Sequence, residues 1–133
     1  MTSASTSARL VIRRPDLTAN VLERVVAALA ARADLPLDRL SDAQIASAAA
    51  AVAASRHMAD GALYVEFDGE PGAVTVRIGP LPAGAAEQVV EESAVPGVGA
   101  IVERLVDRWS VDRRATGDES LSLAIVDRDG AGP

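Results

Sequence analysis

The only histidine of the chain, His57, ends an alanine-rich stretch, "SDAQIASAAAAVAASRH", at positions 41–57. A histidine can act as a general base or as a metal ligand, but either task needs a partner group. The chain has no cysteine and no second histidine, which excludes a thiolate nucleophile, a disulfide and a multi-histidine metal site. The favoured interpretation is a histidine at a helix end, where its charge suits the C-terminal dipole.

A pair of glycines, Gly97 and Gly99, precedes a stretch with helical spacing. Glycines at the start of a helix let the backbone come close to a phosphate group. The same pair, with Pro96 before it, is also typical of a plain turn from a loop into a helix. Two interpretations stay open here: a remnant phosphate loop and an ordinary turn.

Charged residues point mainly to a solvated surface. Glu87, Glu91 and Glu92 predict an exposed acidic helix face, and such a face would repel a polyphosphate if it served as a lid. The net charge of −6 at pH 7 argues against direct nucleic-acid binding, which depends on cations. A protein partner with a basic surface remains compatible with this charge. The scattered arginines predict surface positions: Arg13, Arg14, Arg104, Arg108, Arg113 and Arg114.

Composition predicts one domain with an aliphatic core, because 49% of the 133 residues are hydrophobic and only 2% are aromatic. We predict a domain over 9–126, a disordered N-terminus at 1–8 and a flexible tail at 127–133. No apolar run approaches the roughly 20 residues that span a bilayer, and the start has no uninterrupted apolar leader segment. A cytoplasmic location without membrane contact is therefore expected.

Two helices are expected after a first strand at 8–14. Asp16 or Thr18 would cap the first helix, and Ser41 with Gln44 matches a capping box that starts the second, which should run to about His57. A hairpin follows at 62–67 and 73–78. Its alternating apolar residues predict one buried face.

The second half begins with a long connection over 79–99 that carries one helical turn around 85–92. An amphipathic helix is then predicted from the apolar spacing of Val98, Ile101, Val102, Leu105, Val106 and Trp109. Strands at 109–114 and 119–126 complete the chain. This order predicts an α/β (α+β) fold class: a two-layer sandwich with a mixed, mostly antiparallel sheet and the helices on one face.

That order, together with "PGVGAIVERLVDRWSV" and "TGDESLSLAI", resembles the histidine-kinase-like ATPase fold of the GHKL or Bergerat type. The likeness is greatest to the bacterial anti-sigma-factor serine kinases, and it covers roughly residues 9–126. The resemblance implies ATP-dependent phosphorylation of a serine. It also implies a glutamate base and a magnesium-binding asparagine on the second helix, and an adenine-binding aspartate at the end of the third strand.

Matched onto this chain, the positions that the resemblance implies on the second helix fall on Ala49, Ala53 and His57. These three residues share one side of a helix. Ile78 or Gly79 stands where the aspartate is expected, and neither can accept a hydrogen bond from adenine. An amino group buried there unpaired would cost roughly 1–3 kcal/mol.

Gly97 and Gly99 remain as the glycine-rich segment. The resemblance therefore implies a degenerate nucleotide site without catalytic residues or metal ligands. No cofactor is expected, and ATP with Mg²⁺ would enter only if the degenerate site still binds it. In an alanine-rich chain, Ala49 and Ala53 are also interpretable as ordinary helix formers.

The leading hypothesis is a non-catalytic protein-interaction module in bacterial transcriptional regulation, with a sigma factor or an antagonist protein as partner. Alternatives are an ATP- or ADP-binding domain without efficient catalysis, and a weakly active serine/threonine kinase that uses displaced residues such as Glu66 or Asp60. A phosphorylatable antagonist domain is disfavoured because two helices precede the central hairpin. A homodimer paired through the first strand or the neighbouring helix and a monomer both stay open.

Overall fold

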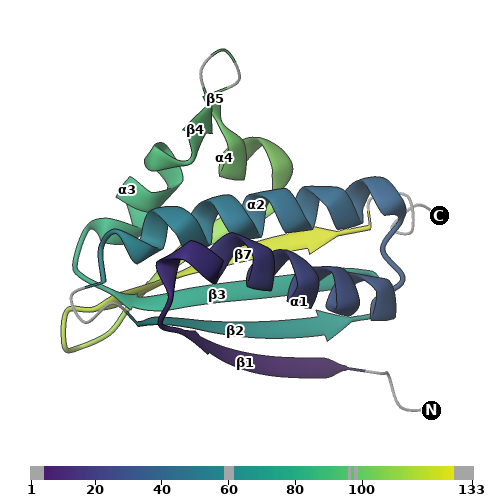
Figure 1. Ribbon diagram of the computed structural model, residues 1–133, viewed down its shortest axis with the longest axis horizontal. Helices are drawn as coiled ribbons and strands as arrows, with labels where there is room; N and C mark the ends of the chain where they lie inside the picture. Colours follow the sequence, from purple (N-terminus) through teal and green to yellow (C-terminus); the bar gives the residue numbers. More distant parts are fainter. Residues whose placement is uncertain (1–4, 59–61, 96, 98, 128–133) are drawn as a thin grey trace.

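The computed structural model describes residues 5–58, 62–95, 97 and 99–127. Seven strands, four α-helices and one 3₁₀ turn lie in this part of the chain (Figure 1). In chain order they are β1 (Thr6–Ile12), η1 (Pro15–Leu17), α1 (Thr18–Arg32), α2 (Leu37–Ser55), β2 (Leu63–Glu70), β3 (Ala73–Leu81), α3 (Ala85–Glu92), β4 (Ala94–Val95), β5 (Gly99–Ala100), α4 (Ile101–Leu105), β6 (Arg108–Arg113) and β7 (Glu119–Val126).

Five strands form the main sheet in the order β1-β2-β3-β7-β6, and every neighbouring pair is antiparallel. The helices α1 and α2 lie together across one face of this sheet (Figure 1). The predicted fold class, an α+β two-layer sandwich with helices on one face, is confirmed. The sheet is antiparallel throughout instead of mixed, and β7, the last strand of the chain, lies between β3 and β6.

Alternation along the strands places the core between the sheet and the helices. Successive side chains of a strand point to opposite faces, so every second residue faces the helices. The predicted inward residues of the hairpin and the last strand are confirmed, each at most 1% exposed: Leu63, Val65, Phe67, Val74, Val76, Ile78, Leu121, Leu123 and Ile125. The core is aliphatic except for Phe67, as the composition predicts.

Nine of the 19 residues of α2 are buried, because the helix packs against α1, α3, α4 and the sheet. Alanine takes up little volume, so neighbouring elements can approach the helix axis closely on several sides. Its buried alanines are Ala43, Ala46, Ala48, Ala50, Ala51, Ala53 and Ala54. The alanine run therefore has a packing role that is independent of any ligand.

The predicted disorder of residues 1–8 is wrong for the three residues that begin β1. Thr6, Ser7 and Ala8 pair with β2, and Ser7 Oγ donates a hydrogen bond to Asp68 Oδ1 at 2.8 Å. Backbone pairing with a buried strand outweighs the small, polar composition of this stretch. Residues 1–4 of the predicted N-terminus and 128–133 of the predicted tail lie outside the described residues.

Both predicted helix caps are wrong. No side chain caps α1; Asp16 instead pairs with Arg14, with 2.7 Å between Arg14 Nη2 and Asp16 Oδ2. The helix α2 begins at Leu37, one turn before Ser41, because the extended Pro36 already accepts the N–H of Leu40 at 2.9 Å.

The proposed capping-box residue Gln44 consequently lies within the helix. Its side-chain amide donates to the backbone oxygen of Glu23 at 3.0 Å and joins α2 to α1. The predicted end of α2 is close, since the helix ends at Ser55 and His57 follows in a turn.

The predicted amphipathic helix through Trp109 is wrong in extent. The helix α4 covers only Ile101–Leu105, Val106 is extended, and Trp109 lies in β6. The N–H of Asp107 bonds the backbone oxygen of Ala124 at 2.9 Å, so strand pairing begins directly after the helix. Val98, the first residue of the predicted stripe, lies outside the described residues.

Regular structure occupies most of the predicted connection 79–99. The strand β3 continues to Leu81, and the predicted helical turn around 85–92 is confirmed as α3. Ala85, Ala86, Val89 and Val90 of α3 are buried, so this segment is packed onto the domain. Over the described residues, no helix combines the length and apolar character that a membrane crossing requires.

Candidate functional site

A hollow of about 310 Å³ lies beside α2, between the start of α1 and the end of α3. We name it the α2 hollow. It is lined by Ala19, Ala48, Ala49, Val52, Ala53, Arg56, Glu92 and Ser93. Two of the predicted site residues, Ala49 and Ala53, thus face the same space. Their methyl groups, with Val52, make one wall apolar, and polar side chains enter only from Arg56, Glu92 and Ser93.

His57 lies outside the α2 hollow and forms a link between helices. Its Nε2 is 3.0 Å from Oε1 of Glu92, so the end of α2 is joined to the end of α3. The histidine lines a second hollow of about 570 Å³, together with Tyr64, Leu81 and Asp118. Glu92 of the predicted acidic face is therefore engaged by a neighbouring element.

Ile78 and Gly79, the predicted adenine-reading positions, also lie apart from the α2 hollow. Ile78 is fully buried opposite Leu121 in the core. A Cβ at Gly79 would lie 2.9 Å from Ser120 Oγ and 3.0 Å from the backbone oxygen of Glu119, so close strand packing requires glycine there. Gly79 lines a hollow of about 350 Å³ together with Arg9 and Glu66, which point away from the helices.

Gly97 and Gly99 lie at the hairpin of β4 and β5 and do not line the α2 hollow. Both have positive φ angles, +82° and +94°, and nothing lies within 4 Å of where a Cβ would be. Backbone conformation, and not close approach of another group, therefore favours glycine at these positions.

Ser93, which the sequence analysis overlooked, occupies the start of α4. The N–H of Ile101 donates to its backbone oxygen at 3.3 Å, and the N–H of Val102 donates to its Oγ at 3.3 Å. Its hydroxyl donates in turn to the backbone oxygen of Val90 at 2.5 Å. The first two amides of this helix are thus bonded to protein oxygens. The local sequence gives no sign of this role, because the amides that Ser93 binds belong to another helix.

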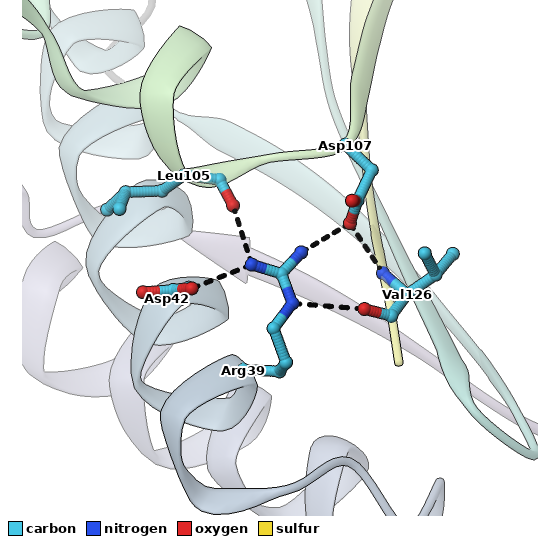
Figure 2. Close-up of polar contacts among 5 residues, drawn as sticks. All are labelled: Arg39, Asp42, Leu105, Asp107 and Val126. Atoms are coloured by element: carbon cyan, nitrogen blue, oxygen red, sulfur yellow. Dashed lines mark hydrogen bonds and ion pairs between the residues drawn. The ribbon is translucent and has the colours of Figure 1, made fainter. Parts of the chain in front are cut away.

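The strongest polar cluster surrounds Arg39, a residue that the sequence analysis did not single out (Figure 2). Arg39 is 5% exposed; its Nη1 donates to Asp42 Oδ2 at 2.7 Å and its Nε to the backbone oxygen of Val126 at 3.0 Å. Its Nη2 donates to Asp107 Oδ2, which also accepts the N–H of Val126 at 2.8 Å. A further bond reaches the backbone oxygen of Leu105.

This cluster joins the start of α2, the end of α4 and the end of β7, three places that are far apart in sequence. Four hydrogen bonds of the arginine tie these segments together, so the cluster acts as a structural clamp. The local sequence gives little sign of it, because Arg39, Asp107 and Val126 come from three separate segments.

A second overlooked residue, Glu119, anchors α3. Its carboxylate is fully buried and accepts the N–H of Ala86 at 2.9 Å and the Nε–H of Arg113 at 3.2 Å. The hydrogen bond from Ala86 lowers the pKa of Glu119 below its ordinary value, with further help from the N–H of Gly84 and from Arg113, against the opposing effect of burial. A charged carboxylate at the start of α3 also interacts favourably with the helix dipole.

The residues proposed for a displaced active site give no such cluster. Glu66 lies on the sheet face away from α2 and pairs with Arg9 at 3.3 Å, and Asp60 lies outside the described residues. Within the described ranges, no three His, Cys, Asp or Glu side chains are grouped closely enough to hold a metal ion. The α2 hollow can hold an apolar or weakly polar group, with Arg56 as its nearest cation.

Comparison with known protein families and curated sequences identifies no relative of this chain. No protein-family model matches the chain, and no curated protein sequence matches it.

Proposed function

We propose that this chain is a non-catalytic protein-interaction module built on a histidine-kinase-like ATPase scaffold. It acts in the cytoplasm, in bacterial transcriptional regulation by partner switching, and binds a sigma factor or an antagonist protein. The scaffold assignment rests on the element order and on the resemblance of the segments around 95–125. The loss of catalysis rests on the lining of the α2 hollow.

One observation carries the proposal: Ala49 and Ala53 present methyl groups to the α2 hollow, where the resemblance implies a base and a magnesium ligand. Mg²⁺ bound to a triphosphate prefers oxygen ligands, and methyl groups supply none. Glu92, the carboxylate of the hollow, is held by His57. One carboxylate of this region, that of Glu92, is thus engaged by another side chain of the protein.

The packing of α3 supports the same conclusion. Glu119 holds its start, His57 holds its end, and Arg113 pairs with Glu87 at 3.2 Å along its exposed side. A segment attached at three places is suited to presenting a fixed surface. The acidic side chains of this helix and the net charge of −6 favour a partner with a basic surface.

Titration calorimetry with Mg-ATP and Mg-ADP tests the proposal, alongside a phosphotransfer assay with labelled ATP and each candidate partner. We expect no heat of binding up to millimolar nucleotide and no labelled partner. Magnesium-dependent serine phosphorylation that is lost in an Ala49→Arg variant, which fills the α2 hollow, would overturn it. Ala28→Arg is the matched control, because Ala28 is exposed on α1.

Nucleotide binding without catalysis is a second candidate, and Arg56 is the observation that favours it. Its guanidinium lines the α2 hollow beside the alanine wall, where it could meet a phosphate group. Sub-millimolar binding of ATP or ADP that is weakened by Arg56→Ala, with no phosphotransfer, would select this candidate over the first.

A further inference from the structure

The sheet face opposite α1 and α2 carries the two most exposed large apolar side chains among the described strand residues. Val11 on β1 is 47% exposed and Tyr64 on β2 is 40% exposed. The two residues are direct partners in the antiparallel register, so they lie side by side. We name this surface the open face. Adjacent apolar side chains on one surface are a common sign of a contact with another molecule.

The open face is high on one side and low on the other. The strands β1 and β2 present long side chains there, such as Arg9, Tyr64 and Glu66. The strands β3 and β7 present mainly small ones, such as Thr75 and Ser122. A hollow of about 690 Å³ lies over this low side and extends to β6. The raised half of the face is therefore complementary in shape to its lower half.

Charged side chains on the open face form a row that crosses from the high side to the low side. Arg9, Glu66 and Arg77 occupy one row across β1, β2 and β3, with alternating sign. Arg9 pairs with Glu66 at 3.3 Å, and Arg77 pairs with Asp112 at 3.4 Å. All four side chains are roughly half exposed or more, so they can contact a further molecule without leaving their strands.

From this relief and this row of charges we infer that the open face binds a second copy of the chain. A two-fold axis along the strands, between β2 and β3, turns each high side onto the low side of the other copy. Glu66 of each copy then meets Arg77 of the other, and Tyr64 lies over the position of Gly79. Sheets that pack face to face keep their strands roughly aligned, as this symmetry requires.

Charge disfavours the alternative pairing through the edge of β1. Antiparallel pairing of Thr6–Ile12 with itself centres on Arg9 and places two guanidinium groups opposite each other. The open-face arrangement brings unlike charges together instead. Four short strands overlap in it, which is a small interface, so the dimer should form reversibly as concentration rises. This inference goes beyond the proposed function and does not depend on it.

Sedimentation velocity over a range of protein concentrations tests the inference with two charge reversals, E66R and R77E. Each single variant should lose self-association, with a dissociation constant raised about tenfold or more, because like charges then meet across the axis. An equimolar mixture of the two variants should associate again, since both cross-axis contacts regain opposite charges. Recovery in the mixture reports a contact between molecules, because each chain still carries its own substitution and any effect of it within the chain.

The matched controls are E91R and R24E, at exposed helical positions away from the open face. They should leave self-association unchanged both singly and mixed, and thermal unfolding should confirm that all four variants are folded. A wild-type chain that stays monomeric at every accessible concentration would overturn the inference. A dimer that survives both reversals, or a mixture that fails to recover association, would overturn it as well.

Discussion

A single buried guanidinium, that of Arg39, connects three segments that the chain order keeps far apart. Its partners are two carboxylates and two backbone oxygens, and these four hydrogen bonds fix the position of the guanidinium (Figure 2). Buried charges of this kind are costly to leave without a partner. Asp107 depends on the same arginine, since its carboxylate is mostly buried beside Val126.

Replacement of Arg39 by alanine should therefore destabilise the fold by about 3–5 kcal/mol, because it removes the buried ion pairs with Asp42 and Asp107 and the bonds to two backbone oxygens. Urea unfolding at neutral pH measures the change in the free energy of unfolding. Arg24→Ala, at an exposed position of α1, is the control and should change it by less than about 0.5 kcal/mol. A loss below about 1 kcal/mol for Arg39→Ala would contradict the clamp.

At Gly79 the absence of a side chain matters for packing. Gly79→Ala should destabilise the fold by about 1–3 kcal/mol, because the added Cβ meets Ser120 and the backbone of Glu119. The control is Gly69→Ala on β2, where the nearest atom would lie 3.7 Å away. If thermal unfolding shows equal effects for both substitutions, strand packing at Gly79 is looser than described.

At the scale of elements, α3 illustrates how a short helix is held in place. It has eight residues, too few to be stable alone, and it depends on Glu119 at its start and His57 at its end. The buried carboxylate bonds amides that would otherwise lack partners at the helix start. The attachment of α3 is therefore electrostatic at its first turn and apolar along its buried side.

Acid should weaken this attachment. The pKa of Glu119 is lower in the folded chain than in the unfolded one, so its contribution is complete above its ordinary pKa and is lost as pH falls through the folded value. Between about pH 5 and about pH 3, Glu119→Gln should lose less stability than the wild type, although it is less stable at pH 7. Urea unfolding across this range checks the slope, with Glu91→Gln as a control that should follow the wild type.

The helix α2 requires small side chains, because neighbouring elements pack closely against it on several sides. Ala50→Leu should destabilise the fold by about 1–3 kcal/mol through overpacking, because Ala50 is fully buried. Ala28→Leu, at an exposed position of α1, should have little effect in the same thermal unfolding experiment. Tolerance of leucine at Ala50 would mean that the alanines are not needed for packing.

The elements that sequence predicted well are those whose signal is local. Alternation alone identified the inward residues of β2, β3 and β7, because one buried face imposes a period of two. The helix through Trp109 failed because apolar spacing in a short segment fits two periods, and pairing with β7 decided between them. The start of α2 failed because Pro36 supplied an earlier start than Ser41.

Little of the candidate site could be derived in this way. Ala49 and Ala53 share one wall of the α2 hollow because helix periodicity fixes which residues share a side, whereas His57 lies outside it. Arg39 and Glu119 were missed because their partners lie 68 and 33 residues away, at Asp107 and Ala86. A charged side chain carries no local sign of burial when its counterpart comes from another element.

At the scale of the whole molecule, stability and self-association have different physical origins. The core is aliphatic and responds weakly to salt, whereas the inferred dimer depends on exposed Glu66 and Arg77. Raising salt from about 0.05 M to about 0.5 M should therefore weaken self-association while the thermal midpoint changes little. Sedimentation and calorimetry on the same samples check this. Self-association that strengthens with salt would point to an apolar contact elsewhere.

The place of β7 between β3 and β6 has a consequence for how the chain is made. Every other strand leaves the ribosome earlier, yet β3 and β6 gain their shared neighbour only when Glu119–Val126 has been synthesised. Until then both strands expose unpaired backbone edges, which invite wrong contacts with other nascent chains. A translation stop before Glu119 would consequently yield an aggregating fragment, and a chaperone that shields early strands would raise the yield of native protein.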